Sequence, residues 1–128
     1  MFRQNLRTAE PMNDMMKGVA DADLQRFADI IAKLPPPPAT EATPEGVRMV
    51  RASDLVRQHR CAFCHAADFS GNESVPRLGA QREDYLLKTL REYKAGIRAE
   101  YQSVMAEVMR PLTDPDIVEL AYYLAHWK

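Results

Sequence analysis

The chain contains two cysteines, Cys61 and Cys64, and both belong to one short motif, C-A-F-C-H, which ends in His65. Two thiols at this spacing beside an imidazole can form a disulfide, help to hold zinc, act as a redox-active dithiol or attach a haem. A structural zinc site needs four ligands, and the other two histidines, His59 and His126, belong to no second paired motif. A thioredoxin-like dithiol belongs with a parallel sheet, which this sequence does not predict. A disulfide leaves the adjacent histidine unexplained.

Haem attachment uses every residue of the motif. The two thiols add to the vinyl groups of the haem, and His65 is thereby carried beneath the iron as its proximal ligand. The motif therefore predicts one covalent haem c, bound through Cys61 and Cys64, with its iron held by His65. The ligand on the other face decides the chemistry. Methionine raises the reduction potential and suits electron transfer, whereas an open face favours the binding of small ligands.

Two methionines are candidates for that second face. Of the seven in the chain, only Met105 and Met109 lie after the loop that follows the motif and before the last predicted helix. Each of them could instead fill a gap in the core, as methionine often does. Their positions in the sequence do not decide which of the two methionines binds the iron.

The elements that must position these side chains are predicted to be helical. Apolar residues recur at helical spacing, and no segment shows the alternation of a strand. One predicted apolar stripe consists of Leu24, Phe27, Ala28, Ile31 and Leu34, and another of Ile117, Leu120, Ala121 and Leu124. Residues 66–80 contain glycine, asparagine and proline that interrupt any periodicity, so we predict a loop there. Thr113 with Asp116 suits a capping box at the start of the last helix. The predicted helices cover residues 24–34, 48–59, 82–95 and the segment that follows Thr113. We expect Gly96 to close the third of them.

An internal repeat relates the two ends of the chain. Residues 12–34 align with residues 105–127 at a constant offset of 93. Upstream, residues 2–7 resemble residues 93–98 when two residues of gap are allowed. Chance similarity between two amphipathic helices is the alternative explanation. The identical pairs are Met12 and Met105, Met16 and Met109, Asp21 and Asp114, Asp23 and Asp116, Ala28 and Ala121, and Ala32 and Ala125.

The composition of the middle of the chain marks a boundary. Four consecutive prolines follow Leu34, and proline cannot continue a helix but favours an extended, semi-rigid spacer. We therefore predict an N-terminal segment of residues 1–34, a proline-rich linker of residues 35–46 and a domain of residues 47–128.

Three stretches together resemble a class I c-type cytochrome. They are C-A-F-C-H-A-A-D-F-S-G, then V-P-R-L-G-A-Q-R-E-D-Y-L-L-K-T-L-R-E-Y-K-A-G-I-R, then M-A-E-V-M-R-P-L-T-D-P-D-I-V-E-L-A-Y-Y-L. The likeness covers residues 47–128 and is closest to one domain of the bacterial two-domain, di-haem cytochromes c. It implies the class I cytochrome c fold, in which helices pack around a covalently attached haem.

The resemblance also implies roles for individual residues. In that family the axial methionine lies eight residues before the Ser or Thr that caps the last helix, which favours Met105 and leaves Met109 in reserve. A proline after the haem loop, here Pro76, offers its carbonyl to the N–H of the proximal histidine. The resemblance further places Leu78, Tyr85, Leu86, Leu90 and Tyr101 in the wall of the haem pocket or core.

Residues 1–34 resemble the C-terminal half of a preceding cytochrome domain that lacks its own haem motif. Met12 stands where the axial methionine of that domain would be, and we expect it to have no haem. An uncovered apolar stripe is unfavourable, so we expect this segment to pack on a neighbour or to pair with a second copy in a homodimer.

The function implied is that of an electron carrier and not an enzyme. One electron at a time would pass between redox proteins of a respiratory chain in the periplasm. The donor would be a dehydrogenase or quinol-oxidising complex, and the acceptor an oxidase or reductase. Two alternatives remain open: a haem domain that binds or senses small ligands, and an electron-transfer module of a larger dehydrogenase complex.

Charge and hydropathy limit the classes of partner that the chain can have. The net charge of −1 argues against nucleic acid, which requires a basic surface. No apolar run approaches the roughly 18 residues of a transmembrane helix, although complexes in a membrane could still be partners. The first residues, M-F-R-Q-N-L-R-T-A-E-P, lack the apolar region of a signal peptide, so the periplasmic location is implied by the resemblance alone.

Overall fold

A computed structural model describes residues 2–5, 7, 9–36, 38–39, 41–72, 74–98 and 103–128. Within these ranges the chain forms helices and no strand, and its β-structure is limited to an isolated bridge between Asn72 and Val75. The all-α prediction is therefore confirmed. The helices are α1 (Met12–Met16), α2 (Asp21–Ile31), α3 (Gly46–Gln58), α4 (Cys61–His65), α5 (Glu83–Lys94), α6 (Ser103–Met109) and α7 (Asp114–Ala125).

Local sequence signals set the ends of these helices. Thr113 accepts a hydrogen bond from the backbone N–H of Asp116, and the Asp116 carboxylate accepts one from Thr113, so the predicted capping box begins α7. Gly96 follows α5 with φ of +73°, a conformation in which glycine is favoured. The predicted stripe of residues 24–34 is helical only as far as Ile31, because the last three residues lie in turns before the proline-rich linker.

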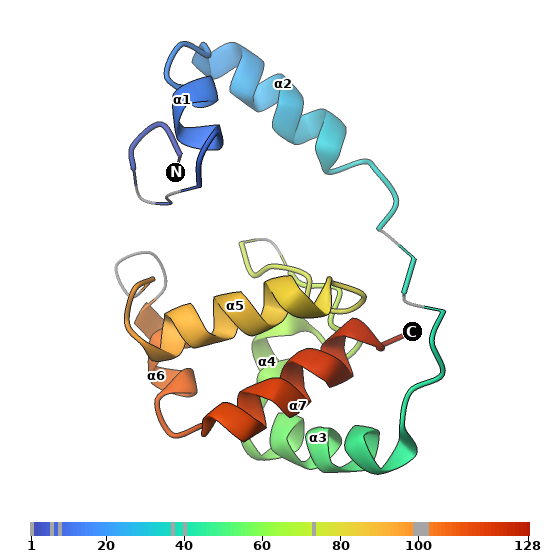
Figure 1. The fold of residues 1–128 in the computed structure, drawn as a ribbon. Coiled ribbons are helices and arrows are strands. Elements are labelled where there is room, and N and C mark those ends of the chain that lie inside the picture. Colours follow the sequence, from blue (N-terminus) through green and yellow to red (C-terminus); the bar gives the residue numbers. More distant parts are fainter. Residues whose placement is uncertain are drawn as a thin grey trace.

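Helices α3 to α7 form one packed unit, with α7 at its centre (Figure 1). Helix α7 packs against both α3 and α5, while α5 also contacts α6 and α3 contacts α4. The stripe predicted for the last helix is consequently buried, and Ile117, Leu120 and Leu124 are at most 3% exposed. The motif helix α4 and the methionine-bearing helix α6 are thus attached to a common scaffold.

The two helices of the N-terminal unit, residues 2–34, lie outside this packed group of helices. Figure 1 shows α1 and α2 on the far side of α5, joined to α3 by the extended linker. Among the described residues, α2 packs against no other helix. The linker ends where the Glu45 backbone N–H donates a 2.8 Å hydrogen bond to the Tyr122 hydroxyl. Tyr85, expected in the pocket or core wall, is instead partly exposed and accepts a 2.8 Å hydrogen bond from Arg7.

The repeat in the sequence is also a repeat in the backbone. At the offset of 93, the last residue of α1 corresponds to the last residue of α6, and Asp21 corresponds to Asp114, so α2 and α7 begin at equivalent positions. Upstream, Asn5 has φ of +55° where its counterpart Gly96 has +73°. Each of these two residues donates its N–H to the carbonyl three residues earlier, at 3.1 Å and 3.0 Å. Chance similarity of two stripes does not account for these details outside the helices.

Candidate functional site

The motif C-A-F-C-H forms a single helical turn, α4, isolated by unusual backbone on both sides. Arg60 before it and Ala66 after it have φ of +55° and +66°, so the chain turns sharply into and out of the motif. Cys61 is partly buried and Cys64 is exposed, and no disulfide joins them. Burial raises the pKa of the Cys61 thiol, and the neighbouring Cys64 adds to the rise.

His65 is buried, with 6% of its surface exposed, and its ring is held by one contact. Its Nδ1 atom lies 2.8 Å from the carbonyl oxygen of Pro76. A carbonyl can only accept, so Nδ1 carries the proton in this contact and Nε2 retains the lone pair that could bind a metal. This is the contact that the resemblance implied for Pro76, and it fixes both the tautomer and the orientation of the ring.

A tight loop brings Pro76 back to the histidine. Asn72 and Val75 exchange backbone hydrogen bonds of 2.9 Å and 2.7 Å, and the N–H of Gly71 donates to the His65 carbonyl at 3.0 Å. Gly71 has φ of +84°, and a Cβ there would lie 2.6 Å from the Val75 carbonyl oxygen. The loop can therefore close this tightly only with glycine at position 71.

Contacts among three aromatic rings pack the loop against the C-terminal part of the chain. The Phe69 ring is 1% exposed, and its centre lies 4.9 Å from that of Trp127 in an edge-to-face arrangement. Tyr123 of α7 lies 6.1 Å from Phe69, also edge to face. These contacts anchor the loop to the central helix of the fold.

A cavity of about 640 Å³ opens beside α4 and is lined mainly by apolar side chains. Cys61, Cys64 and His65 line it, and so do both candidate methionines of α6, Met105 and Met109. Met109 is 1% exposed and belongs to the core, whereas Met105 is partly buried at its edge. The residues of the motif and the two methionines, which are 40 or more positions apart in the chain, therefore meet in one cavity.

Only some of the residues expected in the wall of the haem pocket or core lie there. Leu78 and Leu90 line the cavity, and Leu86 is buried in the core. Tyr85 reaches neither the cavity nor the core, and Tyr101 lies outside the described residues.

The sequence had assigned Leu120 and Leu124 only to a buried stripe, yet both line the cavity. Periodicity shows that a face is buried but does not show whether protein or a cofactor covers it. The other lining residues that it missed are His59, Arg60, Ser74, Val75, Val104, Val108 and Leu112.

The residues around the cavity fit a haem. A flat, mostly apolar group needs a large apolar cavity, two thiols at its edge and an imidazole with a free nitrogen, and all three are present. A zinc site would need a cluster of several ligands, and no group of three or more His, Cys, Asp or Glu side chains suited to a metal lies within the described ranges. No described helix is long and apolar enough to cross a membrane.

Comparison with known proteins agrees with this geometry. The family model of cytochrome c matches residues 49–128. The chain is similar to cytochrome c4 of Pseudomonas aeruginosa, with 37% identity over 71 residues, which cover 53% of this chain and 33% of that protein. The chain thus matches about a third of the length of this relative.

Two solved structures are similar in fold along nearly the whole chain. Reduced recombinant cytochrome c4 from Pseudomonas stutzeri gives a TM-score of 0.84 at 23% identity, covering 95% of this chain and 68% of that one. Cytochrome c4 of Acidithiobacillus ferrooxidans gives 0.82 at 19% identity, covering 98% of this chain and 77% of that one. Together with the helical architecture, these likenesses confirm the class I cytochrome c fold.

The family match includes the whole of C-A-F-C-H and both candidate methionines. The cofactor of this family is haem c, attached covalently, and the motif with Cys61, Cys64 and His65 has the arrangement that this attachment requires. The chain therefore belongs to the cytochrome c family.

Proposed function

We propose that the chain is a one-electron carrier in which His65 and Met105 are the axial ligands of the haem iron. The observation that carries this proposal is the apolar cavity that brings the thiols of α4, the buried His65 and the Met105 side chain together. Similarity to cytochromes c4 supports the same chemistry. When bound, the haem supplies the change between Fe(II) and Fe(III).

The chain's own residues would limit the rearrangement of the site when the iron changes between Fe(II) and Fe(III). The Pro76 carbonyl holds the proton on Nδ1 of His65, so the imidazole cannot rotate or exchange tautomers. Leu78 and Leu90 present apolar side chains to the cavity, which disfavours water there, and α7 packs against both α3 and α5. A site that hardly rearranges between its two charge states is suited to transferring electrons.

The choice between the two methionines rests on their surroundings. Met109 is almost completely buried, so a packing role accounts for it. Met105 lines the same cavity from its more accessible side. The eight-residue spacing from Thr113 also favours Met105.

Paired variants of the haem-loaded protein test this assignment. Met105→Ala should abolish the methionine-sulfur to iron charge-transfer band and lower the reduction potential. Met109→Ala should keep the band but lower the free energy of unfolding by about 2–5 kcal/mol through the cavity it leaves. Loss of the band in Met109→Ala alone would reassign the ligand to Met109. Carbon monoxide binding by the reduced wild-type protein, without a methionine band, would favour the small-ligand sensor.

We further propose that residues 1–34 are the C-terminal half of a cytochrome-like unit, joined by the linker of residues 35–46 to the haem domain of residues 47–128. The repeated helix ends and the left-handed residues Asn5 and Gly96 support this division. The length over which the fold resembles cytochromes c4 supports it as well.

The partners we propose are redox proteins of a periplasmic respiratory chain, with a dehydrogenase or quinol-oxidising complex as donor and an oxidase or reductase as acceptor. The unpaired N-terminal unit also favours a second possibility, that the chain is the electron-transfer module of a larger complex. Purification of the chain at its natural abundance separates these cases, because a module should elute with its complex and a shuttle should elute alone.

A further inference from the structure

We propose that two contacts made by the end of α5 hold both ends of α6 in place, so that Met105 stays bound to the iron. Lys94 makes one of these contacts, and Glu92 makes the other with Arg98. The proposal rests on the ligation by Met105 proposed above. It assigns Lys94, Glu92 and Arg98 as positioning residues that act through Met105.

Helix α6 is too short to hold its own position. It has seven residues, and an isolated helix of this length is not stable in water. Within the described side chains of α6, residues 104–109, only Met109 is buried, while Val104 is 68% exposed. Met105, near the start of the helix, is only partly buried. The part of α6 that carries Met105 therefore depends on contacts with other segments of the chain.

Lys94, the last residue of α5, contacts the end of α6. Its Nζ atom donates a 3.1 Å hydrogen bond to the carbonyl oxygen of Arg110, the residue that follows α6. The last carbonyls of a helix have no partner within the helix, and the helix dipole also favours a cation there. Arg91, one turn earlier on α5, binds Asp114 at the start of α7 through two hydrogen bonds of 2.7 Å and 2.8 Å. Residues 110–114 are consequently attached to α5 at both ends.

An ion pair attaches the chain that enters α6. Arg98 lies five residues before Ser103, where α6 begins, and its Nε atom donates a 2.5 Å hydrogen bond to the carboxylate of Glu92 on α5. The two side chains are only 17% and 22% exposed. The guanidinium carbon also lies 5.7 Å from the centre of the Tyr93 ring. Water screens such a pair less than it screens a pair on the open surface, so this contact contributes more than an ordinary surface ion pair.

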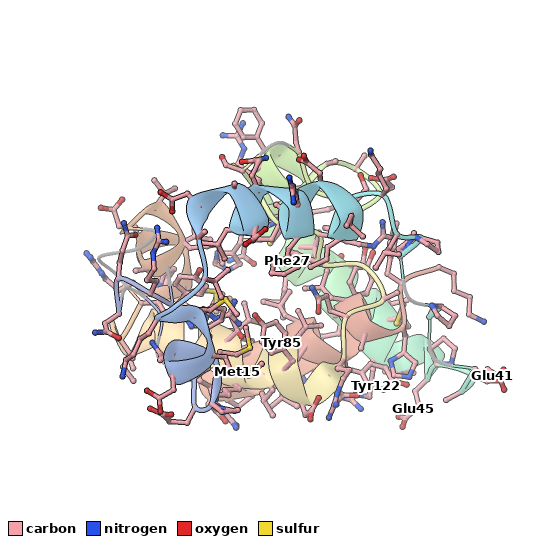
Figure 2. The ribbon with its side chains drawn as sticks, turned by 90° about the horizontal axis from the view of Figure 1, so that it is seen from above. Met15, Phe27, Glu41, Glu45, Tyr85 and Tyr122 are labelled. Carbon is pink, nitrogen blue, oxygen red and sulfur yellow. The ribbon has the colours of Figure 1, made fainter. Side chains whose placement is uncertain are left out.

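The surroundings of Arg98 preserve its charge. Burial opposes that charge, but Glu92 and, to a smaller extent, Tyr85 raise the pKa of the guanidinium above its ordinary value. Tyr85 lies on the side of α5 that faces the N-terminal unit, where Arg7 donates a 2.8 Å hydrogen bond to its hydroxyl (Figure 2). The attraction between Arg98 and Glu92 therefore persists wherever the carboxyl is ionised.

Displacement of Met105 by imidazole separates a positioning role from a contribution to overall stability. Imidazole binds the oxidised iron only after the methionine has left it. Its apparent affinity for the haem-loaded protein therefore reports how readily α6 moves away while the rest of the domain stays folded. A contact that only stabilises the fold would change urea unfolding and leave this affinity unchanged.

Removal of either contact should make the displacement easier. Lys94→Met and Arg98→Met should each bind imidazole roughly fivefold more tightly than wild type, since a hydrogen bond to a charged group contributes at least that factor. Lys94→Arg keeps both the charge and a donor, so it should retain the wild-type affinity. Amide hydrogen exchange in residues 103–109 should be faster in the two methionine variants and unchanged in Lys94→Arg.

Two variants control for the loss of a positive charge from α5 itself. Lys88→Met removes a lysine whose Nζ atom is 3.8 Å from Glu92, a separation longer than a hydrogen bond. Arg82→Met removes an exposed ion pair with Asp84 at the opposite end of the helix. Both variants should bind imidazole as wild type does.

A Met105→Ala background provides a further control. There Lys94→Met should leave the imidazole affinity unchanged, because no methionine remains to be displaced. An increase in that background would mean that Lys94 controls entry to the cavity, which would overturn the proposal.

The proposal would also be overturned by wild-type affinity in either Lys94→Met or Arg98→Met, or by an equal increase in Lys88→Met. Failure of the proposed function gives a different result, because retention of the methionine band in Met105→Ala would refute the ligation itself. That band is recorded before imidazole is added, so the two failures are distinguishable.

Discussion

Arg7 and Tyr85 are 78 residues apart, and Nη2 of the arginine donates a 2.8 Å hydrogen bond to the tyrosine hydroxyl. The guanidinium carbon also lies 6.0 Å from the centre of the tyrosine ring. The contact joins the N-terminal unit to α5 of the haem domain. A second bond, from Glu45 to Tyr122, attaches the end of the linker to α7.

Removal of the Tyr85 hydroxyl should loosen the N-terminal unit without unfolding the haem domain. A hydrogen bond of this kind contributes about 1 kcal/mol, so Tyr85→Phe should speed amide exchange in α1 by roughly fivefold. Hydrogen exchange followed by mass spectrometry measures this. Tyr123→Phe, which removes a hydroxyl inside the haem domain, should leave exchange in α1 unchanged. Equal exchange in Tyr85→Phe and wild type would show that other contacts hold the unit.

The loop beneath His65 should be intolerant of a side chain at Gly71. Gly71 and Gly96 both have positive φ, so alanine at either position costs about 1 kcal/mol in backbone strain. Only at Gly71 would the Cβ also meet backbone atoms at 2.6–2.8 Å, while at Gly96 nothing lies within 4 Å. Urea unfolding of the haem-loaded protein should therefore show Gly71→Ala to be less stable than Gly96→Ala by about 1–3 kcal/mol. Equal losses would mean that the loop can shift to make room.

The capping box of α7 predicts a stability that depends on pH. Hydrogen bonds from the Thr113 side chain and backbone lower the pKa of the Asp116 carboxyl below its ordinary value of 3.8. A carboxyl with a lowered pKa stabilises the fold above pH 3.8, and this contribution is lost as the pH falls through the lower value in the folded state. Thr113→Ala should cost about 1 kcal/mol at neutral pH, and the difference from wild type should shrink in acid.

Urea titrations of wild type and Thr113→Ala at several pH values check this. Thr43→Ala, in the exposed part of the linker, is the matched control and should equal wild type throughout. A difference between Thr113→Ala and wild type that is constant down to pH 3.8 and below would exclude the carboxyl as its source.

The two thiols should differ in reactivity before haem is attached. In the haem-free chain, Cys64 is exposed, whereas Cys61 is partly buried and burial raises its pKa. Because the thiolate is the reactive form, Cys64 should be alkylated first, and Cys61 should need a higher pH. Peptide mapping after timed alkylation distinguishes them, and both should react alike in urea. Faster modification of Cys61 in the folded chain would contradict the burial.

Much of the haem domain could be predicted from local signals. C-A-F-C-H identified the attachment site because two thiols and an imidazole at that spacing suit one cofactor. Thr113, Asp116 and Gly96 marked helix ends through backbone chemistry that acts within a few residues. These features could be predicted because each depends only on residues that are close to it in the chain.

Tyr85 shows where such reasoning failed. The resemblance placed Tyr85 in the wall of the haem pocket or core, yet its hydroxyl accepts a hydrogen bond from Arg7 of the N-terminal unit. Periodicity gives the direction of a side chain relative to its helix but not the neighbour on that side. For the same reason, the sequence predicted that Leu120 and Leu124 are buried but not that they line the cavity.

The sequence by itself determined the helical class, the loop, the repeat and the attachment motif, because each depends on residue types at fixed short spacing. Only the tertiary structure decided that Met105 and Met109 share a cavity with His65, and that Pro76 turns back to within 2.8 Å of its ring. It also decided that α7 is covered while its repeat on α2 is not. Burial is a property of what packs against a face, and the residues of that face do not encode their neighbours.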